Sequence, residues 1–131
     1  MVLDTSVLVA IACGEPETGD FLDALATNEP RLLSAANFVE AGIVLEARFG
    51  AAGGDWLRDF VAETGVDVIP VTVEQARAAV GAFRQYGKGR HPAALNFGDC
   101  FAYALAQTAG EALLFKRDDF ARTDVRAVAY G

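Results

Sequence analysis

The chain has 131 residues, of which 53% are hydrophobic, so we expect a single domain spanning residues 1–131 around one core. Its net charge of −7 disfavours a nucleic-acid partner at first sight, because phosphate binding depends mainly on Lys and Arg. The longest uncharged apolar run near the start, residues 7–13, is too short to cross a bilayer, and Asp4 interrupts any signal peptide. We therefore expect a cytoplasmic protein with no membrane association. Cys13 and Cys100 lack CxxC spacing, which predicts two small buried residues and no disulfide or zinc site.

The chain opens with a very short apolar strand, residues 1–3, followed by Asp4, Thr5 and Ser6. These three residues are oxygen ligands as well as common helix caps. Ligands of open parallel sheets bind at the carboxyl ends of the strands, so we expect Asp4 at the mouth of a cleft. Asp4 or Thr5 also fits a simple cap of the next helix, residues 7–12, and the residues alone leave both interpretations open.

Two further helices are predicted over residues 16–27 and 35–49, with a strand over residues 31–34 between them. Ser34 is expected to cap the second of these helices and Gly50 to end it. At 100° per residue, Glu40 projects among Ala36, Ile43, Val44 and Ala47, and so points toward the core. A buried carboxylate needs a cation, a basic side chain or a metal ion. A structural ion pair, or a helix face misjudged by one position, explains Glu40 as well.

The second half of the chain continues the alternation of helices and strands. Gly53 and Gly54 are expected to open a helix that runs through residue 62, before a strand over residues 66–71. A capping box from Thr72 to Gln75 opens another helix, in which Phe83 and Tyr86 fit core packing better than base stacking. The remaining predicted elements are a helix over residues 96–109, a strand over residues 112–115 and a short strand over residues 125–130.

One stretch of this acidic chain is basic. No acidic residue lies between Glu74 and Asp99, and the stretch contains Arg77, Arg84, Lys88, Arg90 and the only histidine, His91. Its centre, residues 86–92, is glycine-rich and is expected to be a mobile surface loop. It does not match a phosphate-binding GxxxxGK[ST] loop. The positive side chains of this loop suit contact with a phosphodiester backbone, although a solvated surface loop explains the basic residues equally well.

The alternation of strands and helices predicts an α/β fold of three layers, α/β/α, with a mostly parallel sheet of four to five short strands. In such a fold, one edge of the sheet collects several carboxylates, namely Asp4, Glu40, Asp99, Asp118 and Asp119. Asp99 also has a complete structural explanation, as the acidic third residue of a helix capped by Asn96. Carboxylates in one pocket repel each other unless a hard divalent cation such as Mg²⁺ or Mn²⁺ is bound. An acidic metal pocket beside a basic strip is the arrangement expected for cutting a polyanion.

Four segments resemble the PIN-domain ribonucleases of the VapC toxin type: residues 2–8 (VLDTSVL), 37–40 (NFVE), 96–104 (NFGDCFAYA) and 113–120 (LLFKRDDF). The resemblance covers the whole chain, and the order and spacing of the four segments make it specific. It implies a compact α/β/α fold and a Mg²⁺- or Mn²⁺-dependent endoribonuclease that cuts structured RNA as the toxin of a toxin–antitoxin pair. It also implies inhibition by a cognate VapB-type antitoxin, a homodimer, and a higher-order complex with the antitoxin.

By matching position, the resemblance makes Asp4, Glu40 and Asp99 the metal-binding and catalytic acids. Ser6 or Thr5 would orient Asp4 or hold a water on the metal, with Asn96 in support. The chain departs from the family at the fourth acid, where Arg117 stands at a position that is acidic or polar in many relatives. Asp118, Asp119 or Asp124 would take its place. Four residues of the basic stretch would hold the RNA backbone, namely Arg84, Lys88, Arg90 and His91.

Two other classes of protein fit the sequence less well. A Mg²⁺-binding signalling module of the phospho-receiver type uses adjacent acids on its first strand, whereas this chain has Thr5 and Ser6 after Asp4. A flavodoxin-like or dinucleotide-binding protein would need a phosphate-binding motif, and the chain contains no GxGxxG.

Overall fold

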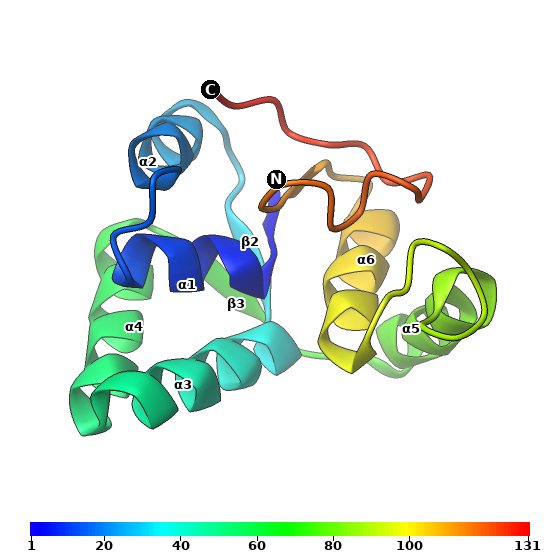
Figure 1. Cartoon of the computed structure of the whole chain (residues 1–131), viewed down its shortest axis with the longest axis horizontal. Coiled ribbons are helices and arrows are strands. Elements are labelled where there is room, and N and C mark those ends of the chain that lie inside the picture. The colour runs from blue at the N-terminus through cyan, green and yellow to red at the C-terminus, as the bar shows by residue number, and fades with distance from the viewer.

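A computed structural model describes all residues 1–131 and confirms the α/β fold. Four short strands form one parallel sheet in the order β3-β2-β1-β4: β1 (Val2–Leu3), β2 (Leu32–Ser34), β3 (Asp67–Ile69) and β4 (Leu113–Leu114). Six helices surround it: α1 (Thr5–Ala12), α2 (Thr18–Thr27), α3 (Ala35–Phe49), α4 (Ala51–Glu63), α5 (Val73–Tyr86) and α6 (Phe97–Ala109). Figure 1 shows the sheet between α1 to α4 on one side and α5 and α6 on the other. None of these helices is long and apolar enough to cross a membrane.

Alternate residues of the central strands supply two separate hydrophobic cores. Val2 and Leu113 pack into the cluster that α5 and α6 cover, whereas Leu3 and Leu114 pack into the cluster under α1 to α4. All four side chains are fully buried. Side chains of a strand alternate between the two faces of a sheet, so a strand buried on both faces must be apolar at every position. This requirement explains the uninterrupted apolar runs at the start of the chain and at residues 112–115.

Polar side chains that the sequence predicts as caps begin four of the helices. Asp4 accepts a hydrogen bond from the Ser6 N–H, Ser34 from the Ala36 N–H and Thr72 from the Gln75 N–H. Asn96 accepts from the Asp99 N–H, and Asp99 accepts in return from the Asn96 N–H, which makes a reciprocal capping box. The cap at Asp4 starts α1 at Thr5, two residues before the predicted start.

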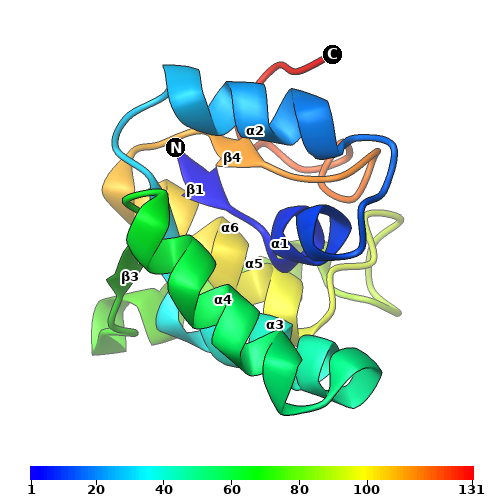
Figure 2. The ribbon, with the colours of Figure 1, turned by 90° about the vertical axis from the view of Figure 1, so that its left-hand side faces the viewer.

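Three predicted elements differ from the structure. Gly53 and Gly54 lie inside α4 instead of opening it. A Cβ on Gly53 would stand 2.3 Å from the Leu45 carbonyl oxygen, so the glycine at this position allows α3 and α4 to pack closely (Figure 2). Residues 125–130 form no strand and contribute one isolated parallel bridge between Ala127 and Leu113. The buried face of α5 carries Gln75, Ala79, Ala82 and Tyr86, as predicted for Tyr86. Phe83, which was also predicted to pack in the core, is 39% exposed.

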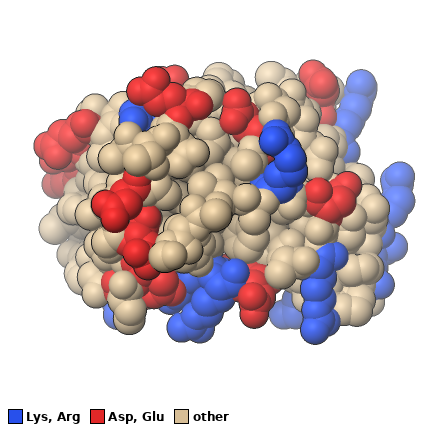
Figure 3. Space-filling model, turned by 90° about the horizontal axis from the view of Figure 1, so that it is seen from above, with Lys and Arg blue, Asp and Glu red and all other residues tan.

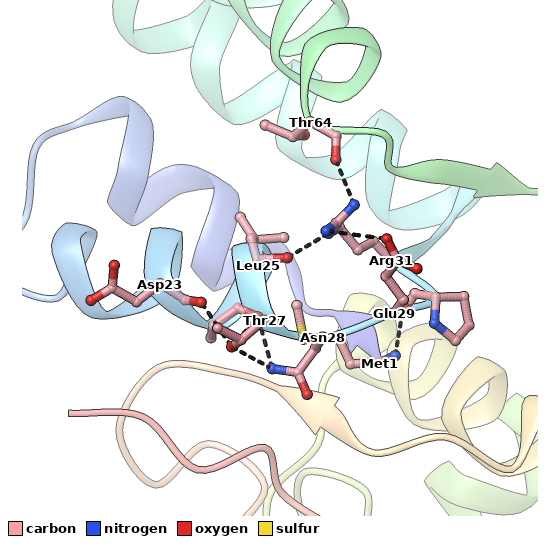
Figure 4. A network of polar contacts seen from close by, with 10 residues as sticks. Met1, Asp23, Leu25, Thr27, Asn28, Glu29, Arg31 and Thr64 are labelled. Carbon is pink, nitrogen blue, oxygen red and sulfur yellow. Dashed lines mark hydrogen bonds and ion pairs between the residues drawn. The ribbon is translucent and has the colours of Figure 1, made fainter.

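The connection between α2 and β2 is fixed by Arg31 (Figure 4). The Arg31 guanidinium donates to the carbonyl oxygens of Leu25 and Thr64, and it forms an ion pair with Glu29 at 3.7 Å. The amino group of Met1 donates to the Pro30 carbonyl oxygen and, at 3.1 Å, to the Glu111 carboxylate. These contacts join the start of β1 to the residues before β2 and to the loop before β4, and so tie three neighbouring strands of the sheet together.

A candidate active site at the carboxyl ends of the strands

Asp4 lies at the carboxyl end of β1, as predicted, and is 3% exposed. Its Oδ2 accepts the Ser6 N–H at 3.1 Å, but its Oδ1 is buried without any hydrogen-bond partner. Burial, together with the negative charges of Asp99 and Asp119, raises the pKa of Asp4 from 3.8 to about 7. A buried carboxylate oxygen without a donor is costly, so Asp4 is suited to bind a cation as well as to cap α1.

Glu40 is held by a small polar network at the first turns of α3. The Thr5 hydroxyl donates to Glu40 Oε1, and the Asn37 amide donates to the same oxygen at 3.4 Å, to the Thr5 hydroxyl at 3.2 Å and to the Gly98 carbonyl oxygen at 3.0 Å. Glu40 is half-buried, and the predicted apolar neighbours Ile43, Val44 and Ala47 are exposed. The buried face of α3 is instead the i, i+4, i+8 row of Asn37, Ala41 and Leu45, so the predicted face was wrong by one position.

Asp99 stands at the start of α6, where its Oδ2 accepts the Asn96 N–H at 3.0 Å. Burial raises its pKa to about 6, and the charges of Asp119 and Glu40 add to this effect. The structural and the functional interpretations of Asp99 are compatible. Its Oδ2 completes the capping box, whereas its Oδ1 accepts no hydrogen bond. The charge of Asp99 in turn raises the pKa of Asp4.

Asp118 and Asp119 follow β4 and line an open pocket of about 440 Å³ together with Asn96, Asp99 and Arg117. The two acids differ in their relation to the rest of the site. Asp119 raises the pKa of both Asp4 and Asp99, whereas Asp118 raises only that of Asp119. Burial raises the pKa of Asp119, while the positive charges of Arg117 and Lys116 oppose that rise.

The segment after β4 is fastened to the start of α1 and to the connection between α1 and α2. The Ser6 hydroxyl accepts the Lys116 N–H at 3.1 Å, and the Lys116 ammonium group forms ion pairs with Glu15 and with Glu17. The Ser6 backbone orients Asp4, as the sequence suggests, whereas Thr5 orients Glu40 instead. Lys116 is thereby paired with Glu15 and Glu17, while its positive charge still acts on Asp119.

Asp124 is the one candidate acid that has no link to the others. It accepts a hydrogen bond from the Tyr103 hydroxyl, which lies one turn of α6 beyond Asp99, and it lines a separate pocket with Gln107 and Arg126. It affects the pKa of Tyr103 and of none of the acids at the strand ends.

The acidic group fits a divalent cation by its chemistry. Its donors are carboxylate oxygens, which hard cations such as Mg²⁺ and Mn²⁺ prefer, and Asp4 Oδ1 is a buried acceptor with no donor. In the described arrangement, no three of the His, Cys, Asp and Glu side chains stand close enough together to hold one ion. The charges of Asp99 and Asp119 act on Asp4, and those of Asp119 and Glu40 act on Asp99, so the four carboxylates are neighbours without forming a complete set of ligands.

The basic stretch lies on the α5 side of the molecule. Figure 3 shows most Lys and Arg side chains toward the end that holds α5, and many Asp and Glu side chains toward the opposite end. Two backbone hydrogen bonds join the ends of the loop of residues 87–95. The Lys88 N–H donates to the Leu95 carbonyl oxygen, and the Leu95 N–H donates to the Tyr86 carbonyl oxygen, both at 2.9 Å. His91 Nδ1 accepts the Ala93 N–H at 3.0 Å, while Arg84, Lys88 and Arg90 are exposed.

Sequence analysis did not single out Asn37 and Gly98 as site residues. Asn37 is fully buried and joins Thr5, Glu40 and α6, and Gly98 leaves the space that Glu40 occupies. A polar residue in the buried i, i+4, i+8 row of α3 was the available signal for Asn37. No sequence signal points to Gly98, because its role depends on a contact with a residue 58 positions earlier in the chain.

A family model described as PIN domain matches residues 1–126. The chain belongs to the PIN-domain family. Within that family it is similar to VapC ribonucleases: ribonuclease VapC30 of Mycobacterium tuberculosis (strain H37Rv) is 48% identical over 129 residues, which cover 98% of both chains. Ribonuclease VapC of Mycolicibacterium smegmatis is 48% identical over 128 residues, covering 98% of this PIN-domain chain and 99% of that protein.

Solved PIN-domain structures share the fold at lower sequence identity. The crystal structure of Mycobacterium tuberculosis VapC20, a Sarcin-Ricin loop cleaving toxin, superposes with a TM-score of 0.78 at 21% identity and covers 97% of both chains. VapBC2 from Rickettsia felis, solved bound to a DNA fragment from their promoter, gives a TM-score of 0.75 at 14% identity, over 98% of this chain and 96% of that one. These two likenesses extend the agreement in fold to distant relatives.

Proposed function

We propose that this PIN-domain chain is a metal-dependent endoribonuclease and the toxin of a VapBC-type toxin–antitoxin pair. The observation that carries the proposal is the buried carboxylate of Asp4, whose Oδ1 has no hydrogen-bond partner. Burial raises the pKa of this carboxylate, and the nearby charges of Asp99 and Asp119 add to the rise. A cation at this point would neutralise a group of carboxylates that otherwise repel one another. The similarity to VapC ribonucleases over nearly the whole chain supports the same activity.

Asp4 and Asp99 would hold the metal ion, with Glu40 and Asp119 beside them. Bound Mg²⁺ or Mn²⁺ would lower the pKa of a water and stabilise negative charge that develops on the phosphate. Thr5 and Asn37 fix the carboxylate of Glu40 from one side, so that Glu40 enters the site in one orientation. Asp99 or Glu40 would accept a proton from the attacking water.

The exposed cations of the α5 side would bind the RNA backbone. Arg84, Lys88 and Arg90 are exposed, and none of them forms an ion pair. Free cations near an acidic metal site let a polyanion approach a protein whose net charge is −7. His91 has one ring nitrogen occupied by the Ala93 N–H, so we assign it to backbone contact and not to proton transfer.

The antitoxin would cover the acidic site and the groove between α3 and α4. This groove has a volume of about 390 Å³, and its walls include Val39 and Ile43, which are 56% and 65% exposed, as well as Glu46 and Asp55. An amphipathic helix with apolar and basic residues is complementary to such a surface. An arginine at its end would pair with the carboxylates of Asp4 and Asp99 and exclude the metal.

The activity is tested by incubating total cellular RNA with the purified wild-type protein and with an Asp4→Asn/Asp99→Asn variant, in Mg²⁺, in Mn²⁺ and in EDTA. Asn keeps the acceptor oxygen that each cap uses and removes the charge, so the variant should fold like the wild type. We expect discrete cuts by the wild type only, and only with metal. Equal cleavage by the folded variant would contradict the proposal.

A further inference from the structure

An apolar pocket beside the acidic site has no role in the function described so far. It lies between α5 and α6, has a volume of about 460 Å³, and is lined only by hydrophobic residues. Three of these are unusually accessible: Phe97 is 79% exposed, Val80 62% and Phe83 39%. The volume lies in the range of about 300–1,000 Å³ that is typical of small-molecule sites.

The pocket adjoins the acidic site through the first turn of α6. Phe97 is the first residue of that helix, and it lies directly between Asn96 and the turn that carries Asp99. Phe97, Cys100 and Phe101 follow the i, i+3, i+4 spacing of one helix face and line the apolar pocket, whereas Asn96 and Asp99 line the acidic pocket on another face. A chain that passes the carboxylates can therefore reach the Phe97 ring with its next groups.

The surroundings of the pocket are basic. The Arg90 guanidinium lies 5.7 Å from the centre of the Phe83 ring, in a cation–π contact at the wall of the pocket. Arg77 and Arg84 are exposed on α5, and no acidic residue lies between Glu74 and Asp99. Exposed aromatic rings beside free cations form the combination that binds single-stranded nucleic acid, in which bases stack on rings while cations follow the phosphates.

We propose that this pocket receives a nucleobase of the RNA next to the bond that is cut, with the base stacked on Phe97. The inference rests on the proposed ribonuclease function and adds to it the place of the flanking nucleotide. The lining residues offer no side-chain donor or acceptor other than the buried Cys100 thiol, so the pocket would favour stacking over base identity. It would thus strengthen the binding of unpaired RNA without selecting its sequence.

The test measures binding of a short fluorescent oligoadenylate by anisotropy, in an Asp4→Asn background so that the RNA is not cut. We expect Phe97→Ala to weaken binding by about 5- to 100-fold, the range of a lost base stack. Phe97→Tyr keeps the ring and should retain the parent affinity. Phe49→Ala serves as the matched control, because Phe49 is 48% exposed at the end of α3, away from the pocket.

An abasic oligomer with the same ribose-phosphate chain separates a base contact from general damage. Phe97→Ala should leave its binding unchanged, because the missing contact is to the base. If Phe97→Ala weakens both oligomers equally and lowers the mass measured by light scattering, the face is an interface between copies of the chain and the inference is wrong. It is also wrong if Phe97→Ala leaves oligoadenylate binding unchanged. If the parent protein binds neither oligomer and wild type cuts no RNA, the proposed function itself fails.

Discussion

Gly98 leaves no room for a side chain next to Glu40: a Cβ at residue 98 would stand 2.0 Å from Oε2 of the glutamate. The carbonyl oxygen of the same glycine accepts the Asn37 amide, which also donates to Glu40. The first turn of α6 therefore fixes the position of a carboxylate on α3. This contact aligns Glu40 with Asp99, one residue after the glycine.

Gly98→Ala should displace Glu40 and impair cleavage while the protein stays folded. The added methyl group meets the end of a flexible side chain, so Glu40 moves and the two helices stay in place. Misplacing a catalytic group by about 1 Å can cost roughly a hundredfold in rate, so we expect a loss of about ten- to a hundredfold in kcat/KM. The measurement is the initial rate on an RNA that the wild type cuts, with circular dichroism as the check on folding.

Gly81→Ala is the matched control. Gly81 lies inside α5, and a Cβ there would meet nothing within 4 Å. Alanine favours a helix over glycine by about 1 kcal/mol, so this variant should gain stability and keep full activity. A similar loss of activity in both variants would show that the effect is not specific to the contact with Glu40.

Thr5→Val tests whether the threonine hydroxyl positions Glu40. Valine has nearly the same shape, but it donates no hydrogen bond to Glu40 and accepts none from Asn37. An unsatisfied polar group costs roughly 1–3 kcal/mol, so we expect a fall of that size in the free energy of unfolding, and an activity below one-tenth of the wild type. Thr5→Ser retains the hydroxyl and should retain most of the activity. If Thr5→Val were as active as Thr5→Ser, Glu40 would not depend on this bond.

The elements of the fold were predictable because their signals are local. Capping residues at Asp4, Ser34, Thr72 and Asn96 indicated four helices, and short apolar runs indicated the four strands to within one or two residues of their observed starts. The exceptions depend on tertiary contacts. Gly53 looked like a helix break until the close approach of Leu45 explained it, and residues 125–130 had the apolar pattern of a strand but form a single bridge to β4.

The site was predictable in its acids but not in their support. Asp4 and Asp99 were proposed from strand-end and helix-start patterns, and Glu40 from a helical projection that is wrong by one position as well as from the family resemblance. Asn37 was missed because an amide in a buried helix row is ambiguous until its partners are known. Phe83 on α5 was also misjudged, because the periodicity of apolar residues counts it as core whether another element covers it or not.

Asp119→Asn should impair cleavage more than Asp118→Asn. The charge of Asp119 acts on both Asp4 and Asp99, whereas that of Asp118 acts only on Asp119. We expect Asp119→Asn to raise the metal concentration needed for half-maximal activity by about tenfold, the equivalent of roughly 1.4 kcal/mol. Asp118→Asn and Asp124→Asn should change it less than twofold. Metal titrations of the cleavage rate decide this, and a larger effect at Asp118 would reverse the assignment of the fourth acid.

Without metal, the folded protein should lose stability as the pH rises from about 4 to 7. The pKa of Asp4 is raised from 3.8 to about 7 and that of Asp99 to about 6, so the folded state binds these protons more tightly than the unfolded state. The free energy of unfolding therefore falls with pH across this window. A rise of about three pKa units corresponds to roughly 4 kcal/mol for Asp4 alone. Urea unfolding in EDTA at a series of pH values measures the fall.

Asp4→Asn should remove most of this pH dependence and make the metal-free protein more stable than the wild type at pH 8. Asparagine keeps an acceptor for the Ser6 N–H and carries no charge into the buried position. Mg²⁺ or Mn²⁺ should restore the stability of the wild type at pH 8, because the ion binds the ionised carboxylates of the folded state, and should leave Asp4→Asn nearly unchanged. Asp23→Asn, an exposed position on α2, should behave like the wild type. If the free energy of unfolding of the wild type in EDTA increased from pH 5 to 8, the raised pKa of Asp4 would be contradicted.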